Sequence, residues 1–96
     1  MSTVVLTQSG ELDIATIPAL MRRLEPHRQP GNRVMLDLRE TVFMDCYALS
    51  LIVGAHADSA TEGWTLSIRV QAPSVLRLLE LTGAANLLPL ELPTAA

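Results

Sequence analysis

Apolar residues recur along the chain at two spacings, every second residue in some segments and every third or fourth in others. The first spacing is typical of strands and the second of amphipathic helices. Strands are predicted at residues 3–8, 33–39, 64–70 and 87–92. Helices are predicted at residues 16–25, 46–61 and 73–83. The second helix is expected to bury one side, made of Leu49, Ile52, Val53, His56 and Ala60.

Residues with strong positional preferences support these boundaries. Thr16 is a favourable cap for the first helix, and Pro18 falls in its first turn, where the missing N–H costs little. Gly63 and Gly83 stand where the second and third helices should end. Pro89 cannot donate a backbone hydrogen bond, so we expect the last strand to lie at a sheet edge.

The alternation of strands and helices predicts an α/β fold in which right-handed crossovers join mostly parallel strands. Strands buried on both faces would be continuously apolar, whereas these strands alternate with polar residues. We therefore expect a small mixed, mostly parallel sheet with helices packed mainly on one face. Residues 10–12 could continue the first strand or pair with it. The 96 residues are expected to form one domain spanning residues 1–96.

Charge and composition narrow the function classes. The net charge is −3, and all seven basic residues are scattered arginines, which disfavours nucleic-acid binding. No apolar stretch is long enough to span a membrane, and the first residues lack the features of a signal peptide. A single cysteine, Cys46, excludes an intrachain disulfide. We expect a cytoplasmic protein without direct membrane insertion.

The residues with the most chemical potential gather in residues 42–51, VFMDCYALSL. Asp45 falls between a predicted strand end and a helix start, where a carboxylate can accept hydrogen bonds from the first helical turn. Cys46 and Tyr47 would then be the first two helical residues. The chain shows no glycine-rich phosphate loop, no recognisable metal-ligand spacing and no catalytic arrangement, so no cofactor is expected.

Three further motifs stand out: residues 10–16 (GELDIAT), 43–49 (FMDCYAL) and 73–83 (PSVLRLLELTG). In their order and spacing, they resemble the signature regions of STAS domains. The resemblance covers nearly the whole chain, and the most similar branch is the bacterial anti-sigma factor antagonists. It implies a small mixed sheet with helices mainly on one side, and a protein that binds partners rather than catalysing a reaction.

The resemblance also implies a partner, an anti-sigma factor that is a serine kinase. In the family, that kinase phosphorylates the serine after the aspartate of the second motif and turns the antagonist off. Asp13 and Asp45 match the family's two acidic positions, and Cys46 stands where that serine should be. Tyr47 replaces the following hydroxyl residue, and Ala48 replaces a glycine. A thiol is not an ordinary serine-kinase substrate, so we expect no phosphorylation switch at Cys46.

The expected docking surface centres on the start of the second helix, with Asp45 as polar anchor and Tyr47 as apolar anchor. Its residues are Asp13, Met44, Asp45, Cys46, Tyr47, Ser50 and Gly54. A homodimer through the half-open sheet face, with Met35 and Val5, is a further expectation.

Simpler alternatives stay open at each of these residues. Asp45 could be a plain helix cap, and Cys46 a semi-buried packing residue. Tyr47 could pack on the first helix or stand exposed.

Two other functions also stay open. STAS domains without the phosphorylated serine also serve as subunits of lipid-transport ATPase complexes or stress-signalling assemblies, which suggests a structural role. A redox-responsive module using Cys46 is the third alternative, although the helix end and Asp45 would act in opposite directions on its thiolate.

Overall fold

Four parallel strands form the main sheet of the protein, which a computed structural model describes over residues 2–91. Their order across the sheet is β1 (Thr3–Thr7), β3 (Arg33–Leu38), β5 (Thr65–Val70) and β6 (Leu90–Glu91). β6 lies at an edge, as Pro89 predicted, and is shorter than expected. Leu92, at the end of the predicted last strand, lies outside the described residues.

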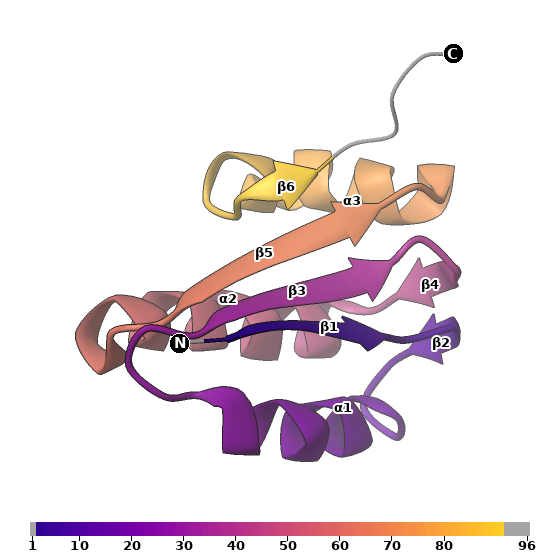
Figure 1. The fold of residues 1–96 in the computed structure, drawn as a ribbon. Coiled ribbons are helices and arrows are strands. Elements are labelled where there is room, and N and C mark those ends of the chain that lie inside the picture. Colours follow the sequence, from indigo (N-terminus) through magenta and orange to yellow (C-terminus); the bar gives the residue numbers. More distant parts are fainter. Residues whose placement is uncertain (1, 92–96) are drawn as a thin grey trace, which may run out of the picture.

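A second, two-stranded sheet lies beyond the carboxyl ends of β1 and β3 (Figure 1). It pairs β2 (Gly10–Leu12) with β4 (Thr41–Met44) in parallel. The expectation that residues 10–12 continue or pair with the first strand is therefore corrected. The reason is β4, a short strand that periodicity did not reveal, whose Thr41 hydroxyl donates to the Gln8 carbonyl at 2.9 Å.

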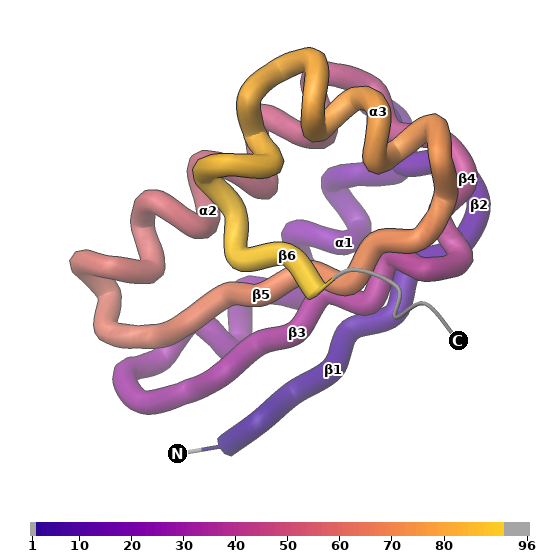
Figure 2. Tube along the Cα trace, turned by 90° about the horizontal axis from the view of Figure 1, so that it is seen from above, coloured from indigo at the N-terminus to yellow at the C-terminus, as the bar shows by residue number. Residues whose placement is uncertain are grey.

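Three helices cover one face of the main sheet. They are α1 (Ile17–Leu24), α2 (Cys46–Glu62) and α3 (Pro73–Thr82), with short 3-10 turns η1 (Glu25–His27) and η2 (Ala84–Asn86). Figure 2 shows them on one side of the strands. The predicted fold class is confirmed, and every strand pair among residues 2–91 is parallel.

The core lies between the helices and the sheet, because alternate strand residues such as Leu36 and Ile68 face the helices. The buried face of α2 differs from the one predicted: Ala60 is exposed, and Val53 and His56 are only half-buried. The residues actually buried are Ala48, Leu49, Ile52, Ala55 and Ser59. Apolar residues surround much of this helix, so periodicity alone did not distinguish its two sides.

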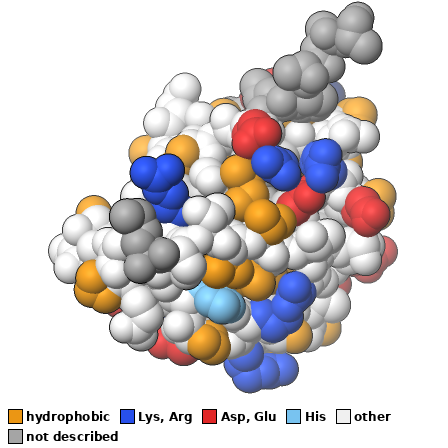
Figure 3. All heavy atoms as spheres, viewed as in Figure 1, with side chains coloured by type: hydrophobic (Ala, Val, Ile, Leu, Met, Phe, Trp, Pro, Cys, Tyr) orange, Lys and Arg blue, Asp and Glu red, His pale blue; other side chains and the backbone are white. Residues whose placement is uncertain are grey.

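The other face of the main sheet carries no helix among the described residues. Val5, Met35 and Ser67 lie side by side across its middle, and Val5 is 51% exposed. The next row contains charged residues of both signs, including Arg69 and Glu91, which form an ion pair at 3.1 Å. Figure 3 shows apolar side chains in the middle of this face and charged ones beside them. Among residues 2–91, no helix combines the length and apolarity that crossing a membrane requires.

Candidate functional site

The amino end of α2 follows directly from β4 and is fixed by Asp45. One carboxylate oxygen, Oδ1, accepts from the Ala48 N–H at 2.7 Å, so the predicted helix cap is confirmed. The other oxygen, Oδ2, accepts from the Ile14 N–H at 3.2 Å. The Asp45 N–H in turn donates to the Leu12 carbonyl at 3.1 Å. Asp45 therefore joins the start of α2 to the segment between β2 and α1.

That segment, residues 13–16, is ordered by its own side chains. Asp13 Oδ1 accepts from the N–H groups of Ala15 and Thr16 at 2.9 and 3.1 Å. The Thr16 hydroxyl lies 2.9 Å from the Glu11 carbonyl and accepts from the Asp13 N–H at the same distance. It makes no cap bond to α1, which differs from the expectation, because these nearer groups use it. The Asp13 carboxylate thus has a local structural role.

One side of the first turns of α2 is open to solvent. Tyr47 is 48% exposed, which decides between the two orientations left open by the sequence. Cys46 is exposed rather than semi-buried. Ser50 and Gly54 are exposed one and two turns further on. Met44 is only 5% exposed and packs in the core, so we leave it out of the surface that a partner could touch.

A shallow apolar groove of about 320 Å³ adjoins this helix start. It runs between α2 and the segment around η2. Its lining residues are Cys46, Leu49, Ser50, Val53, Thr82, Ala84 and Leu87. Leu87, which is 61% exposed, is an accessible apolar side chain that the sequence reasoning placed in a strand. Its described lining residues include no ionisable side chain apart from the Cys46 thiol, so the groove suits apolar contacts.

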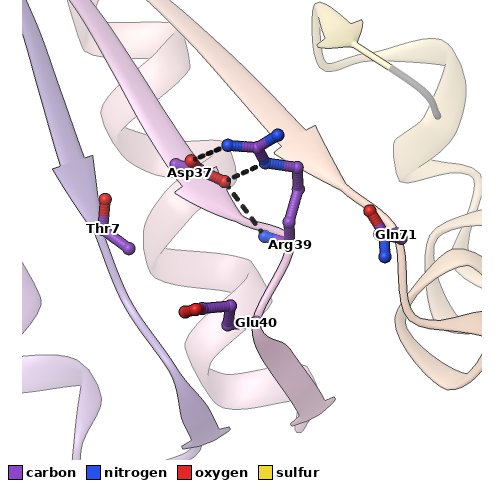
Figure 4. A pocket seen from close by; sticks show the side chains of 5 residues that line it. All are labelled: Thr7, Asp37, Arg39, Glu40 and Gln71. Atoms are coloured by element: carbon purple, nitrogen blue, oxygen red, sulfur yellow. Dashed lines mark hydrogen bonds and ion pairs between the residues drawn. The ribbon is translucent and has the colours of Figure 1, made fainter. Parts of the chain in front are cut away.

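A second, polar hollow of about 410 Å³ lies at the carboxyl ends of the main strands. It is lined by Thr7, Asp37, Arg39, Glu40 and Gln71 (Figure 4). The Arg39 guanidinium donates to both Asp37 oxygens, at 2.9 and 2.8 Å. These hydrogen bonds hold the pKa of the Asp37 carboxyl below its ordinary value, although burial acts in the opposite direction. Among the described residues that line this hollow, Asp37 is the one buried charged group, and it is already partnered.

The described residues contain no group of three or more His, Cys, Asp or Glu side chains arranged to hold a metal ion. The site at the start of α2 therefore consists of a capping carboxylate, an exposed thiol, an exposed phenol and adjacent apolar surface. This combination is typical of a protein contact.

Sequence reasoning missed Ile14, which is 65% exposed on the loop that Asp45 holds. The available signal was an isoleucine directly after Asp13, in a loop where polar residues are usual. The partner of its N–H lies 31 positions away, which no local pattern reveals.

Comparisons with known proteins agree with this fold. The family model described as "Mlab, STAS domain" matches residues 1–89. An anti-sigma-B factor antagonist of Staphylococcus aureus (strain NCTC 8325) is 35% identical over 80 residues, which are 82% of this chain and 74% of that protein. The anti-sigma-B factor antagonist of Bacillus subtilis (strain 168) is 25% identical over 80 residues, 83% of this chain and 73% of that protein.

A crystal structure of a candidate anti-sigma factor antagonist from Thermotoga maritima superposes with a TM-score of 0.71. The match covers 95% of this chain and 80% of the Thermotoga chain. The two sequences are 19% identical, so the likeness supports the fold alone. The class is thus a small α/β domain with its helices on one face of a parallel sheet. More particularly, the chain belongs to the STAS-domain family, and its relatives include anti-sigma-B factor antagonists.

Proposed function

We propose that this chain is a non-enzymatic regulatory module that docks on an anti-sigma factor of serine-kinase fold through the amino end of α2. The docking surface, called here the amino-end surface, comprises Asp13, Asp45, Cys46, Tyr47, Ser50 and Gly54. The observation that carries the proposal is the exposure of Cys46 and Tyr47 at the helix start. The relatives' names supply the class of partner.

The hydrogen bonds of Asp45 change the role expected for it within this surface. Both of its carboxylate oxygens accept backbone N–H groups of its own chain. Tyr47 therefore carries the larger part of the proposed contact, as an exposed aromatic anchor.

Binding to purified anti-sigma factors of the source organism tests the proposal, with Tyr47→Ala as the site variant. Val5→Ala is the matched control, because Val5 is 51% exposed but lies on the opposite face of the sheet, which no helix of residues 2–91 covers. We expect Tyr47→Ala to weaken binding about tenfold or more and Val5→Ala to change it less than about twofold. Equal effects of the two variants, or no binding by the wild type, would contradict the proposal.

Phosphorylation at position 46 is proposed to be absent. We expect incubation with ATP and the kinase partner to leave the intact mass unchanged, whereas Cys46→Ser gains one phosphate. Phosphate on residues 45–47 of the unsubstituted chain would refute this expectation. A Cys46→Ser variant that docks normally but stays unmodified would show that the match to the family's serine position is wrong.

A structural role in a stable assembly is the second candidate, favoured by the absence of a hydroxyl at position 46. A copurifying ATPase subunit, or a large homo-oligomer on sizing, would favour it over transient binding to a kinase-fold partner.

The homodimer through Val5 and Met35, the cytoplasmic location and the redox role of Cys46 stay predictions. Sedimentation of a Met35→Glu variant tests the homodimer, and reversible oxidation that alters partner binding tests the redox role.

A further inference from the structure

We propose that Asp45 is a positioning residue, which bridges the loop of residues 13–16 to the first turn of α2 and so presents Ile14 as a second apolar contact beside Tyr47. The inference rests on the function proposed above and deepens it. It differs from a direct role of Asp45 in the contact, because the carboxylate would act through the residues that it holds.

The bridge is visible in the way Asp45 uses its two oxygens. An ordinary helix cap needs one acceptor, and here Oδ1 supplies it to the Ala48 N–H at 2.7 Å. Oδ2 remains for the Ile14 N–H at 3.2 Å. A hydrogen bond to a charged oxygen is stronger than one between neutral groups. One carboxylate therefore connects two segments that are 31 residues apart.

The loop that Asp45 holds is closed by hydrogen bonds among its own residues. Asp13 and Thr16 close it internally, through the Thr16 hydroxyl and the Ala15 and Thr16 N–H groups. Among the hydrogen bonds of the described residues, the Ile14 N–H has Asp45 as its side-chain acceptor. Fixing that amide therefore adds to the backbone hydrogen bond from the Asp45 N–H to the Leu12 carbonyl, and together they orient the loop relative to α2.

Large apolar side chains are exposed around this bridge. The described chain exposes seven large apolar side chains, and four of them come from this loop and the adjoining β4–α2 segment. They are Ile14 (65% exposed), Val42 (59%), Phe43 (47%) and Tyr47 (48%). A contact surface that is ordered before binding loses less conformational freedom when the partner arrives. Asp45 provides that order for Ile14.

Asp45→Ser separates the bridge from the cap. A serine hydroxyl still caps the helix, but its one oxygen cannot occupy the positions of both Asp45 oxygens, which accept from Ala48 and Ile14 separately. By hydrogen exchange, we expect the Ile14 amide to exchange about tenfold faster in this variant, while the Ala48 amide keeps its protection. Asp45→Ala, which removes both acceptors, should speed exchange at both amides. Unchanged exchange at Ile14 in Asp45→Ser would overturn the bridge.

A double-mutant cycle with the anti-sigma factor that the wild type binds tests the contact. We expect Ile14→Ala to weaken binding about tenfold in the wild-type background and less than about threefold in Asp45→Ser, because the Ile14 amide is then no longer held by a side chain at the start of α2. Losses that simply multiply would show that Asp45 acts independently of Ile14, and would overturn the positioning role. If the wild type binds no anti-sigma factor, the proposed function and the contact role of Ile14 fall together, while the exchange rates decide the bridge on their own.

Discussion

At the carboxyl end of α2, charged and aromatic side chains contact one another within the chain. The Arg28 guanidinium donates to Glu62 at 2.8 Å and to Asp58 at 3.2 Å. It also lies 5.6 Å from the centre of the Trp64 ring. Trp64 is 2% exposed, and its indole N–H donates to Glu62 at 2.8 Å. At the amino end, by contrast, Tyr47 is 48% exposed and its ring is open to solvent.

The carboxyl end of α2 is built into the fold, whereas the amino end is the part that we propose for binding. Side chains whose polar groups are hydrogen-bonded within the chain, and whose apolar surface is buried, stabilise the fold. Large apolar side chains left in solvent contribute little to folding and are available to a partner. We therefore expect substitutions at the carboxyl end to change stability, and substitutions at the amino end to change binding.

The largest expected effect compares the two aromatic residues. We expect Trp64→Ala to lower the free energy of unfolding by about 3–5 kcal/mol, because it leaves a cavity in the core. Tyr47→Ala should lower it by less than about 0.5 kcal/mol, because the ring is half exposed. Urea unfolding followed by circular dichroism measures both. Should Trp64→Ala prove unfolded, Trp64→Phe replaces it, with a smaller loss. Similar losses at positions 47 and 64 would break the comparison.

Arg28 should give the next largest effect. Its side chain is 19% exposed and forms ion pairs with Glu25, Asp58 and Glu62. We expect Arg28→Ala to lower the unfolding free energy by about 1–2 kcal/mol, since packing on Trp64 is lost together with the charges. Part of this loss should disappear in 1 M salt, which screens the exposed carboxylates. Arg22→Ala on the exposed side of α1 is the control, with a change within about 0.5 kcal/mol.

Two glycines, one inside α2 and one at its carboxyl end, should respond to substitution by alanine with stability changes of opposite sign. Gly63 ends α2 at φ +83°, a conformation that an alanine adopts with strain, so we expect Gly63→Ala to destabilise by about 1 kcal/mol. Gly54 lies inside the helix, and nothing lies within 4 Å of the position an added Cβ would take. Gly54→Ala should therefore stabilise by about 0.5–1 kcal/mol. Thermal unfolding distinguishes the signs, and two losses would contradict the local geometry.

Gly54→Ala also tests how far along α2 the proposed partner contact extends. If the partner reaches Gly54, two turns beyond the start of α2, the added methyl group should weaken docking although the fold is more stable. Unchanged affinity would confine the amino-end surface to residues before Gly54.

Much of the fold could be predicted because it depends on local signals. The alternating strands, Pro18 in the first turn of α1 and the left-handed glycines at 63 and 83 are properties of neighbouring residues. The Asp45 cap is likewise local, since its partner is Ala48. Such features depend on backbone geometry and helix ends, which a few residues determine.

The parts that escaped prediction are contacts between distant segments. β4 was not predicted, because its pairing with β2 joins residues about thirty positions apart. The same is true of the Ile14–Asp45 hydrogen bond and of Arg28 on Trp64. The predicted buried side of α2 was partly wrong, because the apolar residues are spread around the helix. Packing against the sheet decides which of them face inward.

The smallest expected effect is the pH dependence at the carboxyl end. The hydrogen bond from the Trp64 indole, and then that from Arg28, lower the pKa of the Glu62 carboxyl below its ordinary value of 4.5. A carboxyl whose pKa is lower in the folded chain stabilises the fold fully above its unfolded pKa, and loses this contribution as the pH falls through its folded pKa. Between about pH 5 and pH 3, the wild type should therefore lose more stability than Glu62→Gln, which keeps an acceptor oxygen for Trp64 but has no charge to lose. Trp64 is the only tryptophan, so its fluorescence during urea unfolding at each pH reports on this end of α2. Parallel stability curves for the two proteins would show that the Glu62 contacts are too exposed to matter, and would weaken the contrast between the two ends.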